Sequence, residues 1–276
     1  MHKTVVTTMR WVSPFGAAQV RGDQEDEGIL GGKGANLARM ARLGLNVPPG
    51  FTIGTAACRA FLTAGEPRLG LWEEVDDAVE SLESQTGRRF GDSEKEPLLL
   101  SVRSGAPVSM PGMLDTVLDV GVNDASVAAL AKAAGSDRFA WDCYRRFVQM
   151  YGEVVAGADA DFFQRELLQR QRARKQGSNG LLPCHDLEDL VRVFKAHIEE
   201  VSGRPFPDDP RTQLRQTVAA IFRSWDNARA REYRRVHGIP DELGTAATVM
   251  TMVFGNRGER SGSGVAVTRT PVTGEP

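Results

Sequence analysis

The feature that most constrains the fold is an apolar run leading into a loop rich in glycine and proline, residues 98–116, LLLSVRSGAPVSMPGMLDT. A short apolar run bounded by turn-forming residues is typical of a buried strand in a covered sheet, so we expect a strand over 98–102. Arg103 then lies at the strand end, where its planar guanidinium suits phosphate oxygens. The glycines and prolines that follow let backbone amides approach an anion closely. The stretch alone equally allows a structural ion pair followed by an ordinary surface loop.

A second glycine-rich segment, residues 31–55, reads GGKGANLARMARLGLNVPPGFTIGT. It predicts a helix over 35–43, a stop at Gly44 and an extended segment over 47–53. Glycine fits the position after a helix, and the two prolines prevent the helix from resuming. The residues expected to face the core from this helix are Leu37, Met40 and Ala41.

Lys33 stands immediately before this expected helix. A phosphate bound there would meet an ammonium group, loop amides and the positive end of the helix dipole. The segment is not a Walker A loop, because Gly34 follows the lysine where Ser or Thr is required and Glu27 occupies the place of the first glycine. The alternative is a helix start that uses its glycines only to turn.

Composition and charge exclude several classes of function. Lys and Arg number 34 against 36 Asp and Glu, a net charge of -2, so the chain lacks the positive field that non-specific nucleic-acid binding needs. No apolar run approaches the roughly 20 residues of a membrane span, and the N-terminus lacks a signal-peptide core. We therefore expect a cytoplasmic protein with neither nucleic acid nor membrane as partner. The 3 cysteines and 4 histidines lack the spacing of a disulfide framework or a zinc site, so no metal site is expected within the chain.

Periodicity predicts a helical middle, residues 124–237, between parts that contain strands. Further expected helices are 55–64, capped by Thr55 and with Cys58, Phe61 and Leu62 inward; 71–85; 139–155; 187–201; and a long one that Asp209 and Pro210 start and residues 237–240 end. The other expected strands are 4–8, 119–123, 245–254 and 264–269. The chain stops at TPVTGEP with a sheet too small to be stable alone, which predicts a truncated piece of something longer.

Two neighbouring arginines fall on different sides of the helix expected over 139–155. At 100° per residue its apolar side chains share one broad arc, with Arg146 at the edge of that arc and Arg145 on the polar side. An arginine at a buried edge needs an anion. That anion is either a bound phosphate or an internal carboxylate.

Taken together, these stretches resemble the N-terminal nucleotide-binding region of the pyruvate, phosphate dikinase family over nearly the whole chain. The motifs that carry the resemblance are ILGGKGANL, VPPGFTI, SVRSGAPVSMPGMLDT, YRRFVQMYGEVV, TMVFGN and SGSGVAVTRTPVTGE. Phosphoenolpyruvate synthases and rifampicin phosphotransferases share the first two elements. They carry an SSATAED-type loop where this chain has SGAPVSMPGM.

The resemblance implies an α+β fold of the ATP-grasp type, with an α-helical insertion subdomain and an incomplete second lobe. Residues 1–122 would form the first lobe, 123–208 the insertion and 209–254 the return to the first lobe. Residues 255–276 would begin the second lobe.

The resemblance also implies roles for single residues. Lys33 and Arg103 would contact the ATP phosphates, and Arg146 would reach in from the insertion. Gly112 and its neighbour Met113 would belong to a mobile loop that closes over the phosphates. The residues that would offer backbone groups to the adenine edge are Thr251, Met252, Val253 and Phe254. Leu114 departs from the family, which often has a second methionine there.

In the family, ATP is split into AMP, with the β-phosphate passing to a histidine on a separate domain and the γ-phosphate to inorganic phosphate. The phosphohistidine then converts pyruvate to phosphoenolpyruvate in a barrel domain. None of the 4 histidines lies in the family's histidine motif, and the acidic Mg²⁺ ligands are expected beyond Pro276. We therefore expect ATP and Mg²⁺ as cofactors of a longer, homodimeric enzyme, and no activity from this polypeptide alone, because Mg²⁺ neutralises the triphosphate during transfer. The alternatives are a stand-alone nucleotide-sensing module and a related phosphotransferase.

Overall fold

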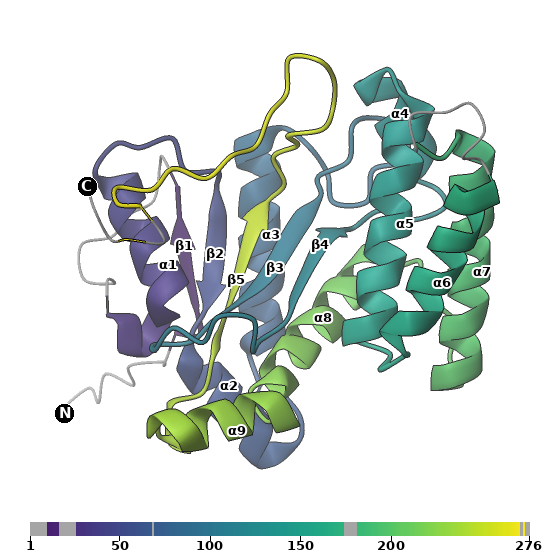
Figure 1. The fold of residues 1–276 in the computed structure, drawn as a ribbon. Coiled ribbons are helices and arrows are strands. Elements are labelled where there is room, and N and C mark those ends of the chain that lie inside the picture. The colour runs from purple at the N-terminus through teal and green to yellow at the C-terminus, as the bar shows by residue number, and fades with distance from the viewer. Residues whose placement is uncertain (1–9, 17–25, 68, 174–180, 271–272, 274–276) are drawn as a thin grey trace, which may run out of the picture.

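A five-stranded antiparallel sheet forms the centre of the molecule (Figure 1). The computed structural model describes residues 10–16, 26–67, 69–173, 181–270 and 273. In spatial order the strands are β1 (Val12–Phe15), β2 (Gly50–Ile53), β5 (Ala246–Thr251), β3 (Leu100–Gly105) and β4 (Thr116–Val120). The last strand in sequence therefore lies in the middle of the sheet and joins β2 to β3.

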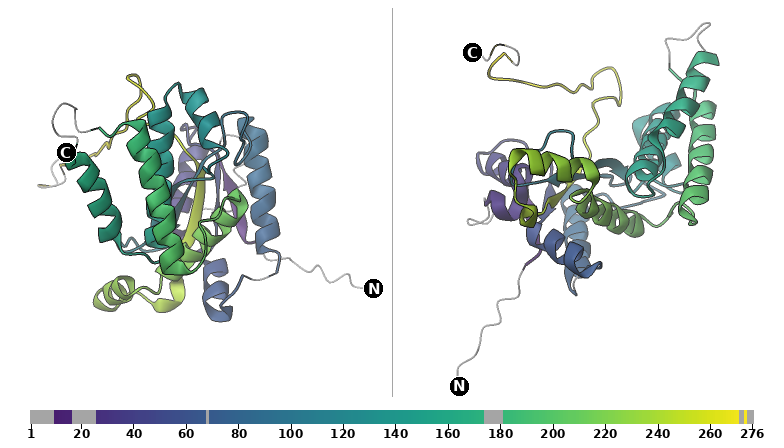
Figure 2. Two further views of the ribbon diagram at one scale, coloured as in Figure 1. Left: turned by 90° about the vertical axis from the view of Figure 1, so that its right-hand side faces the viewer. Right: turned by 60° about the horizontal axis from the view of Figure 1, so that its bottom comes forward.

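Helices surround this sheet on both faces and beyond one edge (Figure 2). They are α1 (Glu27–Arg42), α2 (Thr55–Ala64), α3 (Leu71–Thr86), α4 (Val127–Ala134), α5 (Asp137–Val154), α6 (Ala160–Ala173), α7 (Cys184–Ser202), α8 (Pro210–Ser224), α9 (Ala228–His237) and a 3₁₀ turn (Asp241–Leu243). Helices α4 to α7 gather beyond β4, with α5 against that strand. The predicted α+β class is confirmed. No helix within the described ranges combines the length and the apolar character needed to cross a bilayer.

Two neighbouring rows of side chains show how the two faces of the sheet differ. One row crosses four strands and is apolar and at most 1% exposed: Phe51, Val249, Val102 and Val117. The next row crosses five strands and is polar: Ser13, Thr52, Thr248, Arg103 and Thr116. Successive residues of a strand point to opposite faces. The apolar row therefore belongs to the core shared with α2 and α8, whereas the polar row faces α1.

Helix α1 reaches the polar face of the sheet through its smallest residues. The helix begins at Glu27, capped by Asp26, and not at residue 35 as predicted. Gly31 interrupts it with non-helical backbone angles, φ 66° and ψ 163°, because this residue and Gly34 lie against the sheet. The predicted inward face is also wrong. The residues buried on α1 are Leu30, Gly31, Gly34, Ala35 and Ala38, and Met40 is 42% exposed.

Several other predicted boundaries differ from the structure. Thr55 does not cap α2, because its hydroxyl donates a hydrogen bond to the Gly28 carbonyl. The predicted long helix is two helices, since the chain turns after Trp225 and Asn227 caps α9. Val201, which was expected on the apolar face of its helix, is exposed.

The predicted strands also differ from the structure. Residues 264–269 form no strand, and residues 252–254 lie outside β5. The strand predicted over 4–8 lies outside the described residues. Asp209 and Pro210 start α8 as predicted.

The two arginines of α5 are placed opposite to the prediction. Arg145 is buried and Arg146 is exposed, with 52% of its side chain accessible. The helical projection assumed one buried face, but α5 packs against α4, α7 and β4 at once, so more than one face of this helix is covered. Asp142 binds both guanidinium groups, at 2.9 Å from Arg145 and 3.0 Å from Arg146.

Asp119 near the end of β4 combines backbone strain with an unpaired carboxylate oxygen. Its φ is 62°, the only positive φ outside glycine in the described part of the chain. The residue is 4% exposed, and its Oδ1 has no hydrogen-bond partner among the described residues. Burial raises the pKa of this carboxyl group to about 7, although the charge of Arg146 opposes the change.

We expect Asp119 to make the stability of the chain depend on pH. Between the usual aspartate pKa and about pH 7 the native state keeps a proton that the unfolded state has released, so the free energy of unfolding falls as pH rises. Asp119→Asn removes this titration, and asparagine tolerates the left-handed backbone. The variant should unfold like the wild type at about pH 4 and be more stable at about pH 8, by about 1.4 kcal/mol for every tenfold difference in proton affinity between the native and unfolded carboxyl group. Urea unfolding at both pH values measures this, and identical pH dependence in both proteins would contradict it.

Candidate functional site

A cavity of about 700 Å³ lies between α1, the end of β3 with the loop that follows it, and β5. Its lining includes three residues that the sequence singled out: Lys33, Arg103 and Gly112. It also includes Glu27, Gly32, Asn36, Leu37, Met40, residues 104–111, Leu114, Thr248 and Met250. Segments far apart in the sequence therefore supply one site.

Lys33 projects from α1, in the helical turn that restarts after Gly31. Its ammonium group donates a hydrogen bond of 2.8 Å to the carbonyl oxygen of Ser104. No carboxylate pairs with it among the described residues. Burial lowers the pKa of this lysine, and the positive charge of Arg103 lowers it further. The free chain thus holds a lysine in surroundings that disfavour its charge.

Arg103 is exposed on β3, opposite Thr248 on one side and Thr116 on the other. Within the described ranges it forms no ion pair or hydrogen bond through its side chain. Two cations therefore face the same cavity without a carboxylate between them, an arrangement that an anion stabilises. The one carboxylate that lines the cavity, Glu27, lies 3.9 Å from the guanidinium of Arg39.

The loop over residues 106–114 is fixed at both ends. At its start the amide of Gly32 donates a hydrogen bond of 3.0 Å to the Ala106 carbonyl oxygen. At its end the Met113 carbonyl oxygen accepts hydrogen bonds from Asn227 (3.3 Å) and Arg229 (3.1 Å). Arg229 also pairs with Asp115. Gly112 adopts a φ of 72° within the loop. The ends are held while the middle lines the cavity.

Apolar side chains line other parts of the same cavity. They are Leu37, Met40, Val108, Leu114 and Met250. Ligand sites commonly combine an apolar wall with a few placed polar groups. This wall and the two cations suit a molecule with a flat apolar part and an anionic part.

The other predicted site residues do not line this cavity. Met113 holds the loop end, and Arg146 pairs with Asp142 on α5, beyond β4 at the edge of the sheet. Thr251 and Met252 use their amides in hydrogen bonds to the carbonyl oxygens of Pro49 and Leu99. Val253 is 71% exposed, and Phe254 packs edge-on against Phe139, with ring centres 5.1 Å apart.

Thr248 and Met250 are cavity residues that the sequence analysis did not identify. Their alternation along β5 places them on one face, and this pattern is visible in the sequence as TVM. Only the pairing of β5 with β3 shows that this face carries Arg103. Asn36, Leu37 and Met40 were missed for a different reason, since two of them were expected to point into the core.

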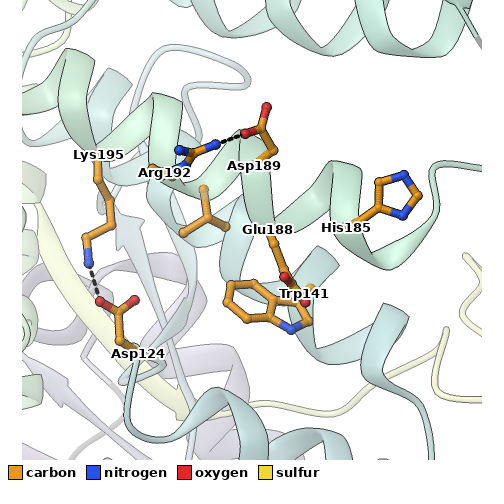
Figure 3. A pocket seen from close by; sticks show the side chains of 8 residues that line it. Asp124, Trp141, His185, Glu188, Asp189, Arg192 and Lys195 are labelled. Atoms are coloured by element: carbon orange, nitrogen blue, oxygen red, sulfur yellow. Dashed lines mark hydrogen bonds and ion pairs between the residues drawn. The ribbon is translucent and has the colours of Figure 1, made fainter.

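A second hollow, of about 540 Å³, lies on the helical side of the molecule against α5 and α7 (Figure 3). Its cations already have partners: Lys195 binds Asp124 at 2.8 Å, and Arg192 pairs with Asp189. Glu188 adds a third carboxylate. An anion is therefore favoured less here than beside Lys33 and Arg103.

The described residues do not fit a magnesium ion held by protein side chains. Nowhere among them do three or more His, Cys, Asp or Glu residues lie close enough together to bind a metal ion. Glu27 is the one carboxylate in the lining of the cavity, so a Mg²⁺ ion there would take its remaining ligands from phosphate oxygens and water. The described side chains of this cavity contribute two cations, a loop and an apolar wall.

Comparison with known proteins found a matching family profile and several similar curated proteins. The profile of the family described as "Pyruvate phosphate dikinase, AMP/ATP-binding domain" matches residues 27–86 and 68–276. Pyruvate, phosphate dikinase of Rhizobium meliloti (strain 1021) is 53% identical over 268 residues, 96% of this chain and 30% of that protein. The chloroplastic dikinase 1 of Oryza sativa subsp. japonica is 47% identical over 98% of this chain and 28% of that protein. The Clostridium symbiosum dikinase is 45% identical over 96% of this chain and 30% of that protein.

The chain thus spans less than a third of the length of these curated relatives. The resemblance inferred from the motifs is confirmed by both the profile and the relatives. A profile that matches most of the chain, together with relatives that are 45% to 53% identical to it, leads to one conclusion. This protein belongs to the pyruvate phosphate dikinase AMP/ATP-binding domain family.

Proposed function

We propose that this chain binds ATP, with the phosphates at Lys33 and Arg103 and the base toward the apolar wall of the same cavity. The observation that carries the proposal is the pair of cations that share one cavity without a carboxylate partner in the described structure. Phosphate oxygens would supply the missing negative charge. The loop over 106–114 would cover them, since its ends are held and its middle lines the cavity.

We further propose that the chain acts as the nucleotide-binding part of a longer dikinase, by analogy with its relatives. In that enzyme the β-phosphate of ATP would pass to a histidine of another domain and then to pyruvate, while inorganic phosphate takes the γ-phosphate. Lys33 and Arg103 would hold the phosphates in place and stabilise their charge. We also propose that the chain divides into structural parts after residues 122, 208 and 254, and that this chain alone is inactive. The full-length enzyme would be a homodimer in the cytoplasm.

Arg146 and the segment over 251–254 remain part of this proposal as additional nucleotide contacts. Arg146 is exposed at 52% of its side chain, so it is free to turn toward a ligand if it exchanges the carboxylate of Asp142 for a phosphate. The amides of Thr251 and Met252 are already engaged, so an adenine edge would meet other backbone groups of this segment.

The proposal is tested by calorimetric titration of the 276-residue chain with ATP, AMP and adenosine. We expect ATP to bind more tightly than AMP and adenosine to bind most weakly, because each phosphate adds charge for Lys33 and Arg103 to neutralise. Equal affinity for all three would show that the cations are not the phosphate site. Failure of the folded chain to bind ATP at all would overturn the proposed function.

A further inference from the structure

Thr248 places a buried hydroxyl group in the candidate cavity that has no hydrogen-bond partner among the described residues. Thr248 on β5 is 2% exposed, and its Oγ1 forms no hydrogen bond in the described part of the chain. A buried hydroxyl without a partner costs free energy. Native structures rarely keep such groups without a reason. The position of Thr248 suggests what its hydroxyl is for.

Thr248 lies where the two cationic residues of the cavity approach each other. Its Cα pairs with that of Arg103 in the register of β5 with β3, and side chains paired in this way are about 5 Å apart at Cβ. Its Oγ1 lies 3.7 Å from the position that a Cβ on Gly105 would take, and the Cβ of Lys33 lies 3.5 Å from the same position. The hydroxyl is thus close to both residues that we assign to phosphate.

Thr52 provides an internal comparison from the same polar row. It pairs with Thr248 across β2 and β5, is 1% exposed, and also has an Oγ1 without a partner in the described structure. Helix α1 covers this hydroxyl, since a Cβ on Gly34 would lie 2.7 Å from it. Thr52 does not line the cavity, whereas Thr248 does. The two residues share chemistry and burial and differ in access to the site.

We propose that Thr248 is a further nucleotide-binding residue, whose hydroxyl donates a hydrogen bond to a phosphate oxygen held by Lys33 and Arg103. This inference rests on the proposed function and adds a contact to it. The oxygen is covered in the free chain, so the contact forms on binding. A change of χ1 between staggered positions on binding would turn the hydroxyl toward the cavity. A phosphate oxygen then satisfies the donor that the free chain leaves unpaired.

The test compares ATP binding and stability in Thr248→Val, Thr248→Ser, Thr52→Val and the wild-type chain. Calorimetry should show that Thr248→Val weakens ATP binding about 10-fold, the effect of a hydrogen bond to a charged group. Thr248→Ser should bind nearly as tightly as the wild type, and Thr52→Val should bind equally well. In urea both valine variants should unfold at or above the wild-type midpoint, because each removes an unsatisfied hydroxyl.

A fall in affinity without a fall in stability separates ligand contact from a structural role. Unchanged ATP binding in Thr248→Val, while Lys33→Met still weakens it, would overturn this inference and leave the proposed function standing. Equal loss in Thr52→Val would also overturn it. Absence of ATP binding by the folded wild-type chain would overturn both. If Thr248→Val fails to fold, Thr248→Ala, which needs less space, replaces it in the same comparison.

Discussion

Replacing Gly31 with alanine is expected to cost more than about 4 kcal/mol of stability, a loss reserved for severe steric conflict. A Cβ at this position would lie 1.6 Å from the carbonyl oxygen of Gly105 and 2.5 Å from its carbonyl carbon. Both are backbone atoms, so no side-chain rotation relieves the conflict. The φ of 66° adds strain for any residue with a Cβ. We expect Gly31→Ala to lose the native structure or to unfold at much lower denaturant.

The surrounding contacts leave α1 and β3 little freedom to separate. Gly32 donates to the Ala106 carbonyl oxygen, and Lys33 donates to that of Ser104, on either side of the close approach. Separation would break both hydrogen bonds and open the candidate cavity. Any Gly31→Ala protein that does fold should therefore also bind ATP weakly.

Gly44→Ala is the matched control for this prediction. Gly44 has a similar φ of 78°, but a Cβ there meets no atom within 4 Å. Its replacement should cost only the backbone strain, about 1 to 2 kcal/mol. Urea unfolding followed by circular dichroism compares the two variants. Equal losses would show that the close approach of Gly31 to Gly105 is not a constraint on the fold.

Local chemistry explains which elements could be predicted from the sequence. Asp209 followed by Pro210 starts α8 as expected, because capping depends on residues a few positions apart. The glycine-rich segment was interpreted as a turn before a helix that starts at residue 35, whereas α1 spans this segment with one break, at Gly31. The break results from the contact of Gly31 with Gly105, which lies on a strand more than 70 positions away. The sequence around Gly31 therefore does not reveal this contact. The first turn of α1, which Asp26 caps, was missed because the glycines that follow it disfavour a helix.

The same difference between local and long-range information applies to the residues of the candidate site. Lys33 and Arg103 were identified from local context, since each stands beside glycine-rich sequence. Their meeting in one cavity depends on the packing of α1 against β3, and the position of Thr248 beside them depends on the pairing of β5 with β3. The exchange of Arg145 and Arg146 likewise follows from elements that pack on two sides of α5. The periodicity of a helix shows which face is apolar, but it does not show that a second element packs against another face of the same helix.

Replacing Lys33 or Arg103 with methionine is expected to lower ATP affinity by about 10- to 100-fold, the loss of one charge-assisted hydrogen bond. Methionine keeps much of the aliphatic stem and removes the charge. Stability should change by less than about 1 kcal/mol, as for a substitution outside the core. In Lys33→Met, removal of a charge that its surroundings disfavour offsets loss of the bond to Ser104. Calorimetry measures the ATP affinity, and urea unfolding measures the stability.

Lys195→Met is the control for this prediction. It removes a lysine already paired with Asp124 and should leave ATP affinity unchanged.

The pH dependence of binding distinguishes direct contact from a general loss of charge. Because burial and Arg103 lower the pKa of Lys33, its ammonium loses a proton at lower pH than an ordinary lysine. Phosphate prefers the charged form, so wild-type affinity for ATP should fall as pH rises through that lowered pKa. Arg103→Met removes one of the two causes that lower the pKa of Lys33, so this pKa should rise. The ATP affinity that remains in this variant should therefore fall at a higher pH than in the wild type. In Lys33→Met the fall should be absent. A pH profile that is the same in all three proteins would mean that Lys33 does not touch the phosphates.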